Sequence, residues 1–136
     1  MKALMTKIIL DTNFLFVPVQ FQIDIFEQLN NLLGKAEPIV LSTTIEELES
    51  LVEKRSGKIR SQAIMALKLA RRCRIIEVEK TPEEGCDDVI VRKAREWNCL
   101  VATNDVNMRR KLREAKVATV FMRQRSHLAI EGQVSV

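Results

Sequence analysis

Residues 7–13 read Lys-Ile-Ile-Leu-Asp-Thr-Asn, a short apolar run that closes on an acid and two turn-forming residues. Such a run is typical of a strand that is buried on both faces of a parallel sheet. In an open α/β sheet, the carboxyl ends of the strands lie along one edge, and ligands bind at that edge. Asp11 therefore marks the first candidate position of a functional site.

The rest of the chain alternates between the same two kinds of pattern. The runs that predict strands are residues 7–10, 38–41, 74–78, 99–102 and 117–122. The patterns that predict helices cover approximately residues 20–33, 43–54, 58–72, 87–97 and 106–115. Residues 14–19 and 80–85 are expected to be loops, and the tail from Arg123 has no assignment. This alternation predicts an α/β fold, a doubly wound parallel sheet with helices on both faces. Right-handed crossovers would place the strand-to-helix loops on one edge.

Length and composition restrict the class of protein. The 136 residues predict a single domain, 1–136, with residues 123–136 as a C-terminal tail. Hydrophobic residues make up 46% of the chain, which indicates a globular protein. There is neither a membrane-spanning run nor a signal peptide, so we expect no membrane association and a cytoplasmic location. Three widely spaced cysteines predict buried thiols, and a single histidine gives little support to a catalytic triad.

Four acids occupy equivalent places, where a strand gives way to a helix: Asp11, Glu47, Asp87 and Asp105. Each has an ordinary explanation when taken alone. Asp11 could hold the backbone of Asn13 in a turn, Asp105 could cap a helix, and Glu47 could complement a helix dipole. The hypothesis of a shared pocket depends on all four lying at one edge of the sheet.

Neighbouring residues help to divide the roles. Thr43 and Glu46 have capping-box spacing, which would leave Glu47 free. Asp87 is three residues before Ile90 and shares its inward face, whereas Asp88 fits a cap or a supporting position.

A cluster of carboxylates in a basic protein indicates divalent metal ions acting on a phosphodiester. Mg²⁺ and Mn²⁺ favour carboxylate and water oxygens. Crowded carboxylates repel one another, and a bound ion would relieve that repulsion and lower the pKa of a bound water. The formal net charge is +4 and would be +8 without the four acids, so a polyanion is a plausible partner.

The chain resembles the PIN-domain nucleases in four motifs. These are residues 8–13 (Ile-Ile-Leu-Asp-Thr-Asn), residues 45–48 (Ile-Glu-Glu-Leu), residues 87–90 (Asp-Asp-Val-Ile) with Ala94, and residues 101–105 (Val-Ala-Thr-Asn-Asp). They occur in the family's order, and the resemblance extends from Lys7 to Met122. Within the family the chain is most similar to archaeal members that resemble the rRNA-processing nuclease of the small-subunit processome, and more distantly to VapC-type toxins.

The resemblance implies a three-layer α/β/α sandwich with a mainly parallel sheet and endonucleolytic cleavage of RNA that depends on Mg²⁺ or Mn²⁺. Members of the family frequently form dimers, so a homodimer is one possible state of this chain. It assigns catalysis and metal binding to Asp11, Glu47, Asp87 and Asp105. The supporting residues would be Asn13, Thr103 and Asp88. Some family members carry a further acid where this chain has Asn107, which leaves the number of metal ions open.

Basic residues are the candidates for holding RNA. One group follows the fourth acid, and a second lies between two predicted helices. The candidates are Arg109, Arg110, Lys111 and Arg113, and Lys54, Arg55, Lys58 and Arg60. A third group, Arg71, Arg72 and Arg74, fits ordinary solvated surface. Trp97 is expected to pack in the core, so contacts to the RNA backbone would dominate, with a steep salt dependence.

Two alternatives remain. The first is a catalytically silent PIN module that binds RNA or a ribosome-assembly partner. The second is a phosphate-signalling domain of similar architecture, which needs a lysine near the end of the last strand. Phe121 and Met122 occupy that place, so the second alternative has little support.

Overall fold

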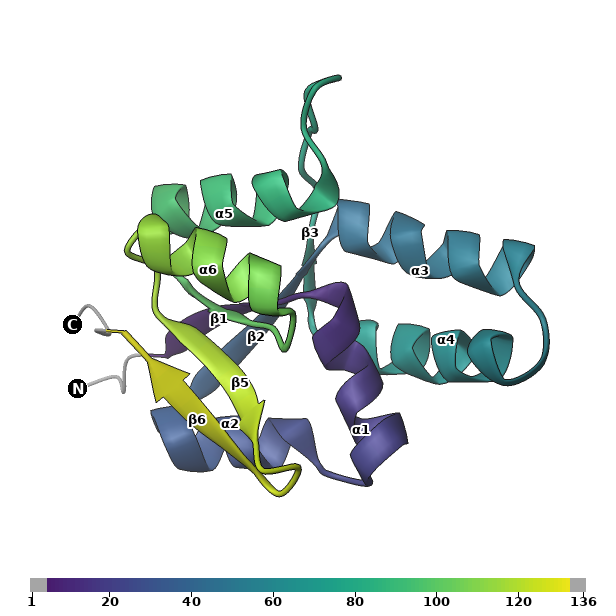
Figure 1. The fold of residues 1–136 in the computed structure, drawn as a ribbon, viewed down its shortest axis with the longest axis horizontal. Coiled ribbons are helices and arrows are strands. Elements are labelled where there is room, and N and C mark those ends of the chain that lie inside the picture. Colours follow the sequence, from purple (N-terminus) through teal and green to yellow (C-terminus); the bar gives the residue numbers. More distant parts are fainter. Residues whose placement is uncertain (1–4, 133–136) are drawn as a thin grey trace.

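A computed structural model describes residues 5–132. Its centre is a six-stranded sheet with the order β3-β2-β1-β4-β5-β6 (Figure 1). The strands β1 to β5 pair in parallel, and β6 runs antiparallel to β5. The strands are β1 (Thr6–Leu10), β2 (Ala36–Leu41), β3 (Arg74–Ile76), β4 (Leu100–Ala102), β5 (Thr119–Arg123) and β6 (His127–Glu131).

Helices cover both faces of the sheet, so the predicted three-layer α/β/α sandwich is confirmed. A 3₁₀ helix and six α-helices are present in the described part of the chain. They are η1 (Thr12–Phe16), α1 (Val17–Phe21), α2 (Ile25–Leu33), α3 (Ser42–Lys54), α4 (Gly57–Ala70), α5 (Cys86–Trp97) and α6 (Val106–Glu114). The helices α3 and α4 pack as a pair whose far end projects from the body (Figure 1).

The strand β1 shows why two core layers form. Ile8 and Leu10 belong to one core, with residues of α2, α3 and α4. Ile9 points to the other core, with residues of α5 and α6. Successive strand residues alternate between faces, so a central strand covered by helices on both sides must be apolar throughout. The apolar run at residues 8–10 satisfies that requirement.

Four strand-to-helix connections lie at the carboxyl ends of the strands. They join β1 to η1, β2 to α3, β3 to α5 and β4 to α6. All four candidate acids occur at or just beyond these connections. The topology thus places them along one edge, as the sequence predicted.

The region after β1 differs from the prediction in two ways. The expected loop at residues 14–19 is helical, forming η1 and α1. The expected helix from Gln20 is interrupted, because Gln22 adopts a left-handed conformation (φ 54°) and Asp24 caps a new helix by accepting the N–H groups of Phe26 and Glu27. The apolar stripe continues through this break, which is why spacing alone did not locate it.

The start of α3 also differs from the prediction. Leu41 is the N-cap residue and supplies no side-chain hydrogen bond, so the expected capping box of Thr43 and Glu46 does not form. Ser42 instead accepts the N–H of Val78 through its hydroxyl, at 2.9 Å. This bond ties the first turn of α3 to the chain leaving β3.

The unassigned C-terminal tail contains an element of the sheet. Residues 127–131 form β6, which pairs antiparallel with β5, and the N–H of Leu128 donates to the side chain of Gln28 in α2. The predicted strand at residues 117–122 is shifted and covers Thr119–Arg123. Val134 and Val136, considered as dimer contacts, lie outside the described residues.

The cysteines and the single tryptophan are buried to different degrees. Cys73 and Cys99 are buried, but Cys86 is half-buried at the start of α5. Trp97 is half-buried and packs against the core on the α5 and α6 face. Between residues 5 and 132, no helix has the length and apolar character needed to cross a membrane.

Candidate active site

Asp11 lies at the end of β1 with its side chain only 6% exposed. Its backbone N–H donates to the carbonyl of Ala102 in β4, at 3.0 Å. Its Oδ1 accepts the N–H of Thr12, at 2.8 Å. Its Oδ2 accepts the hydroxyl of Thr103, at 2.7 Å, and the side-chain amide of Asn13, at 3.2 Å. Asp11 thus binds the side chain of Asn13 and not, as expected for a simple turn, its backbone.

Thr103 and Asn13 connect the first acid to the fourth. The hydroxyl of Thr103 donates to Asp11 and accepts the N–H of Asp105, at 3.2 Å. The side-chain carbonyl of Asn13 accepts the N–H of Asn104, at 3.0 Å. The ends of β1 and β4 are therefore joined by side-chain hydrogen bonds in addition to the sheet.

Asn104 extends this network to the next strand. Its side-chain carbonyl accepts the N–H of Met122 in β5, at 2.7 Å. Sequence reasoning overlooked this residue, since an asparagine in a loop has no spacing signal that would identify a bond to a strand 18 positions later.

Asp105 is the N-cap of α6, as its position predicted. Its Oδ1 accepts the N–H of Asn107, at 2.8 Å, and that of Met108, at 3.4 Å. Both bonds use the same oxygen, so Oδ2 makes no hydrogen bond within residues 5–132. One residue can therefore start the helix and still present an oxygen to a ligand.

The other two acids are held by helices on the β2 and β3 side of the edge. Glu47 is half-buried in the second turn of α3, and Asp87 is half-buried in the first turn of α5. Asp88 accepts the N–H of Gly85, at 2.9 Å, and so caps α5. Its capping position was predicted.

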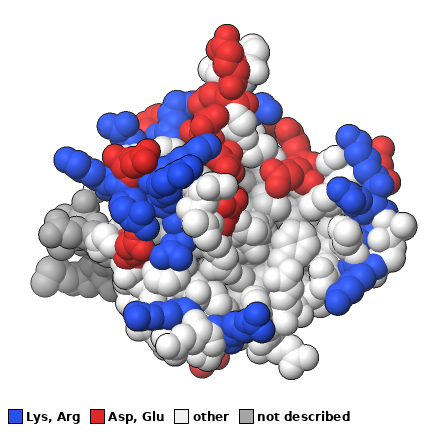
Figure 2. Space-filling view, viewed as in Figure 1, with Lys and Arg blue, Asp and Glu red and all other residues white. Residues whose placement is uncertain are grey.

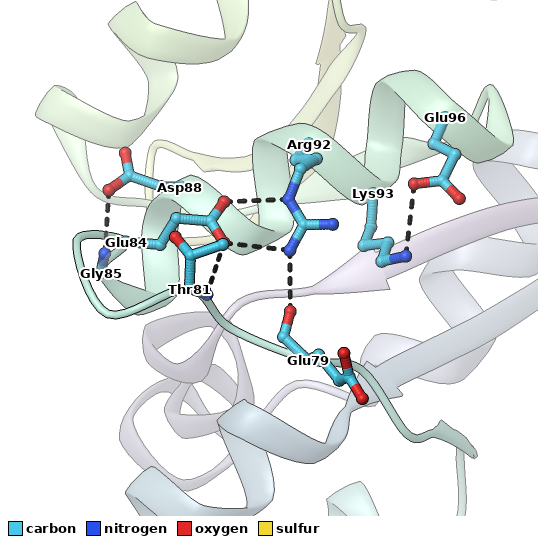
Figure 3. A network of polar contacts seen from close by, with 8 residues as sticks. All are labelled: Glu79, Thr81, Glu84, Gly85, Asp88, Arg92, Lys93 and Glu96. Atoms are coloured by element: carbon cyan, nitrogen blue, oxygen red, sulfur yellow. Dashed lines mark hydrogen bonds and ion pairs between the residues drawn. The ribbon is translucent and has the colours of Figure 1, made fainter.

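The loop before α5 is fixed by residues that sequence reasoning missed (Figure 3). Arg92 donates from Nε to one oxygen of Glu84, at 2.9 Å, and from Nη2 to the other, at 3.0 Å. The same Nη2 reaches the backbone carbonyl of Glu79, at 2.8 Å. Glu84 also accepts the N–H of Thr81. Because Arg92 binds both ends of this loop, it fixes the approach to Asp87. A separation of eight residues between Arg92 and Glu84 is not a helical pairing distance, which explains why it was missed.

The four acids influence one another electrostatically. Burial raises the pKa of Asp11 from its ordinary 3.8 to about 6, against the opposing effect of the hydrogen bonds from Thr103 and Thr12. The negative charges of Asp87 and Glu47 make smaller contributions to this same increase. Burial also raises the pKa of Asp87, Lys111 lowers it, and the carboxylates of Asp105 and Glu47 add to the increase.

The expected tight convergence of the acids is only partly realised. Within residues 5–132, no three His, Cys, Asp or Glu side chains lie close enough to chelate one ion directly. The acids nevertheless line one edge and supply only oxygen donors. Mg²⁺ retains several water molecules and usually binds through one or two carboxylates. The donor set therefore fits a largely hydrated Mg²⁺ or Mn²⁺.

Of the basic candidates, Arg109 and Arg113 are held in ion pairs with Glu131, and the others are exposed to solvent. Figure 2 shows basic side chains over α6 on the left and at the end of the α3–α4 pair on the right, with acidic side chains between them. Arg109 lies over the ring of Phe121, with 3.8 Å to the centroid, and pairs with Glu131 of β6, at 2.8 Å. Arg113 pairs with the same carboxylate, at 2.7 Å. These two arginines therefore anchor α6 to β6.

The remaining basic candidates are more accessible. Lys111 lies 3.8 Å from Asp88, and Arg110 is exposed. At the end of the α3–α4 pair, the second group is exposed, and in it Arg60 donates to the carbonyl of Val52. The members of that group are Lys54, Arg55, Lys58 and Arg60.

Comparison with known proteins gives consistent matches. The PIN like domain family model matches residues 8–125. Ribonuclease VapC4 of Methanocaldococcus jannaschii is 33% identical over 132 residues, covering 96% of this chain and all of that protein. The rRNA-processing protein FCF1 of Saccharomyces cerevisiae is 32% identical over 111 residues, covering 79% of this chain and 54% of the yeast protein. The match to FCF1 therefore spans about half of that protein.

A solved structure agrees with these sequence matches. The structure of the PIN domain endonuclease Utp24 superposes with a TM-score of 0.76 at 28% identity, covering 96% of this chain and 94% of that chain. The identities to VapC4 and FCF1 are nearly equal, so they do not separate the two branches. With its motifs in order, its fold matched and nearly its whole length covered by the family model, the chain belongs to the PIN-domain family.

Proposed function

We propose that this protein is an endoribonuclease that hydrolyses RNA phosphodiester bonds with the help of Mg²⁺ or Mn²⁺. One observation carries the proposal. The buried carboxylate of Asp11 shares the carboxyl edge of the sheet with Glu47 and Asp87, and the charges of those two acids raise its pKa. Relatives named as ribonucleases support the reaction class.

Asp11, Glu47, Asp87 and Asp105 would hold the ion. A bound divalent ion supplies a water molecule of lowered pKa and stabilises negative charge on the phosphate. The chain itself orients the oxygens. Thr103 and Asn13 fix Oδ2 of Asp11 from two directions, and the first turn of α6 fixes Oδ1 of Asp105.

Exposed cations beside the acids would hold the RNA backbone. Arg110 and Lys111 lie on α6, the helix that Asp105 caps. The exposed cations at the end of the α3–α4 pair lie on the other side of the acids (Figure 2). Contacts of this kind position a nucleic acid without reading its sequence. RNA affinity should therefore depend strongly on salt.

Several finer expectations belong with this proposal. Relatives named for rRNA processing make a structured ribosomal precursor a reasonable substrate class. A homodimer, a ribosome-assembly or regulatory partner, a cytoplasmic location and the assignment of residues 1–136 to one domain stay predictions.

One observation favours the catalytically silent alternative: the described acids do not form a three-residue chelating group. A cleavage assay on single-stranded and structured RNA with Mn²⁺ distinguishes the two. The endonuclease should cut internally, EDTA should stop it, and Asp11→Asn should abolish cleavage while RNA binding in EDTA persists. If wild type and variant bind RNA equally and neither cuts, the protein is a binding module.

A further inference from the structure

A recess that none of the four candidate acids lines lies on the sheet face that carries α5 and α6. Those two helices contact β4 and β5, so the neighbouring part of the face, over β2 and β3, is less covered. A cavity of about 260 Å³ opens there, lined by Lys7, Ile39, Arg74, Ile76 and Trp97.

Strand register explains why these side chains share one face. Lys7 stands two residues before Ile9, and side chains two apart on a strand point to the same side. Ile39 is in the same core as Ile9, and it pairs directly with Arg74. Ile39 and Ile76 thus form an apolar floor, with cations at the amino-terminal end of the strands.

The wall of the cavity is aromatic. Trp97, the last residue of α5, packs against the core on one side and remains half exposed. Lys93 lies 5.3 Å from the centre of the Trp97 ring. Figure 3 shows that Lys93 is itself paired with Glu96. Trp97 lines the cavity and Lys93 does not, so part of the indole surface faces the cavity without contact from Lys93.

The charge of the cavity favours an anion. Arg74 is paired with Glu37, at 2.8 Å, which neutralises part of its charge. Lys7 makes no ion pair within residues 5–132, so its ammonium is available to a ligand. The lining therefore combines an aromatic wall, an apolar floor and one free positive charge.

We propose that this cavity binds one nucleotide unit, with its base against Trp97 and the isoleucines and its phosphate on Lys7 and Arg74. Bases pack favourably on aromatic side chains and do so with little sequence preference. Lysine and arginine are the usual phosphate contacts. The cavity is slightly smaller than the range of about 300–1,000 Å³ that suits drug-sized ligands, which fits a single base. The ligand is either a free mononucleotide or a segment of an RNA chain that passes this face.

The chain offers a direct signal for this site. Trp97 is the only tryptophan, and there is no tyrosine. Intrinsic tryptophan fluorescence and the single indole N–H resonance therefore report on the surroundings of Trp97, which include the cavity. Titration with AMP, with UMP and with a short single-stranded RNA, all in EDTA, measures binding whether or not the protein is a nuclease. N-acetyltryptophanamide, titrated in parallel, corrects for absorption by the ligands.

We expect saturable quenching and a shift of the indole resonance. Lys7→Gln should weaken binding about fivefold, and Arg74→Gln less because Glu37 already offsets that arginine. Lys68→Gln, the same change on exposed α4 over the opposite face, should have no effect. RNA binding much more tightly than either mononucleotide assigns the site to an RNA chain, and the reverse order assigns it to a free nucleotide.

Two outcomes would overturn the proposal. One is the absence of any saturable change up to about 10 mM mononucleotide or RNA, a range that detects even millimolar Kd values. The other is a change that Lys7→Gln and Arg74→Gln leave intact, or that Lys68→Gln reduces equally, because binding would then not involve the cavity.

Discussion

The acid edge has two halves that are built differently. On the β1 and β4 side, Asp11 receives three hydrogen bonds and is joined to Asp105 through Thr103. On the β2 and β3 side, Glu47 and Asp87 sit half-buried on α3 and α5, and their geometry depends on how those helices are anchored. One half is fixed by side-chain hydrogen bonds, and the other by helix placement.

This difference suggests a division of labour. A carboxylate with both oxygens hydrogen-bonded has one orientation and little tolerance for a change in length. A helix side chain whose rotamer is not fixed can move its carboxylate, and a water molecule can bridge the remaining distance to an ion. We therefore expect substitutions of equal chemical size to have unequal effects in the two halves.

Changing side-chain length should give the largest contrast. Asp11→Glu adds a methylene to a buried carboxylate, and displacement by about 1 Å can cost about 100-fold in rate. Glu47→Asp shortens a half-exposed side chain and should cost about tenfold, because water can fill the gap. Single-turnover cleavage rates in Mn²⁺ measure both, with Glu46→Asp on the exposed face of α3 as the control. Equal losses for Asp11→Glu and Glu47→Asp would remove the proposed distinction.

The raised pKa of Asp11 predicts a stability effect that depends on pH. The folded protein binds this proton more tightly than the unfolded chain, so folding becomes less favourable as the pH rises from about 4 to beyond 6. The shift from 3.8 to about 6 corresponds to about 3 kcal/mol. The Asp11→Asn variant has no titrating group at this position, so it does not lose this stability as the pH rises. The free energy of unfolding of the variant minus that of wild type should therefore rise by up to about 3 kcal/mol between pH 4 and pH 7. Urea unfolding in EDTA measures this, and a difference that is constant with pH would contradict it.

Removing a hydroxyl should distinguish a paired threonine from an unpaired one. Thr103→Val leaves the buried carboxylate of Asp11 without its shortest hydrogen bond and should lower the free energy of unfolding by about 1–3 kcal/mol. Thr44 is fully buried, and its hydroxyl has no hydrogen-bond partner among the described residues. Thr44→Val, the matched control, should be neutral or stabilising. Similar losses in the two variants would mean that the Thr103 bond contributes little.

The smallest effects are expected from the basic residues of α6. Arg110→Gln removes an exposed cation, so the slope of log affinity for single-stranded RNA against log salt should fall by about 0.7. Arg113→Gln should change that slope less, because Glu131 already neutralises its guanidinium. Binding titrations at several salt concentrations measure both slopes. A larger change for Arg113→Gln would show that RNA displaces Glu131.

Sequence reasoning was most reliable where a pattern has one physical meaning. The apolar run at residues 8–10, the acid-to-helix transitions and the cap at Asp105 all follow from local rules. It failed where several local solutions have similar energies. Gln22 breaks a helix without glycine or proline, and Ser42 binds Val78 in place of a capping box. Residues 127–131 form a strand because β5 offers an unpaired edge, which their own sequence does not reveal.

The sequence by itself determined the alternation of strands and helices, and hence that Asp11, Glu47, Asp87 and Asp105 would meet one edge of a sheet. Chain connectivity and hydrophobic periodicity are local properties, and they are sufficient for that. Only the tertiary structure decided which acid is buried and that Thr103 joins Asp11 to Asp105. It also decided that Arg92 fixes the loop before Asp87 and that Glu131 binds two arginines of α6. Those contacts join residues far apart in the chain, and their energies depend on distances and burial that exist only after the layers have packed.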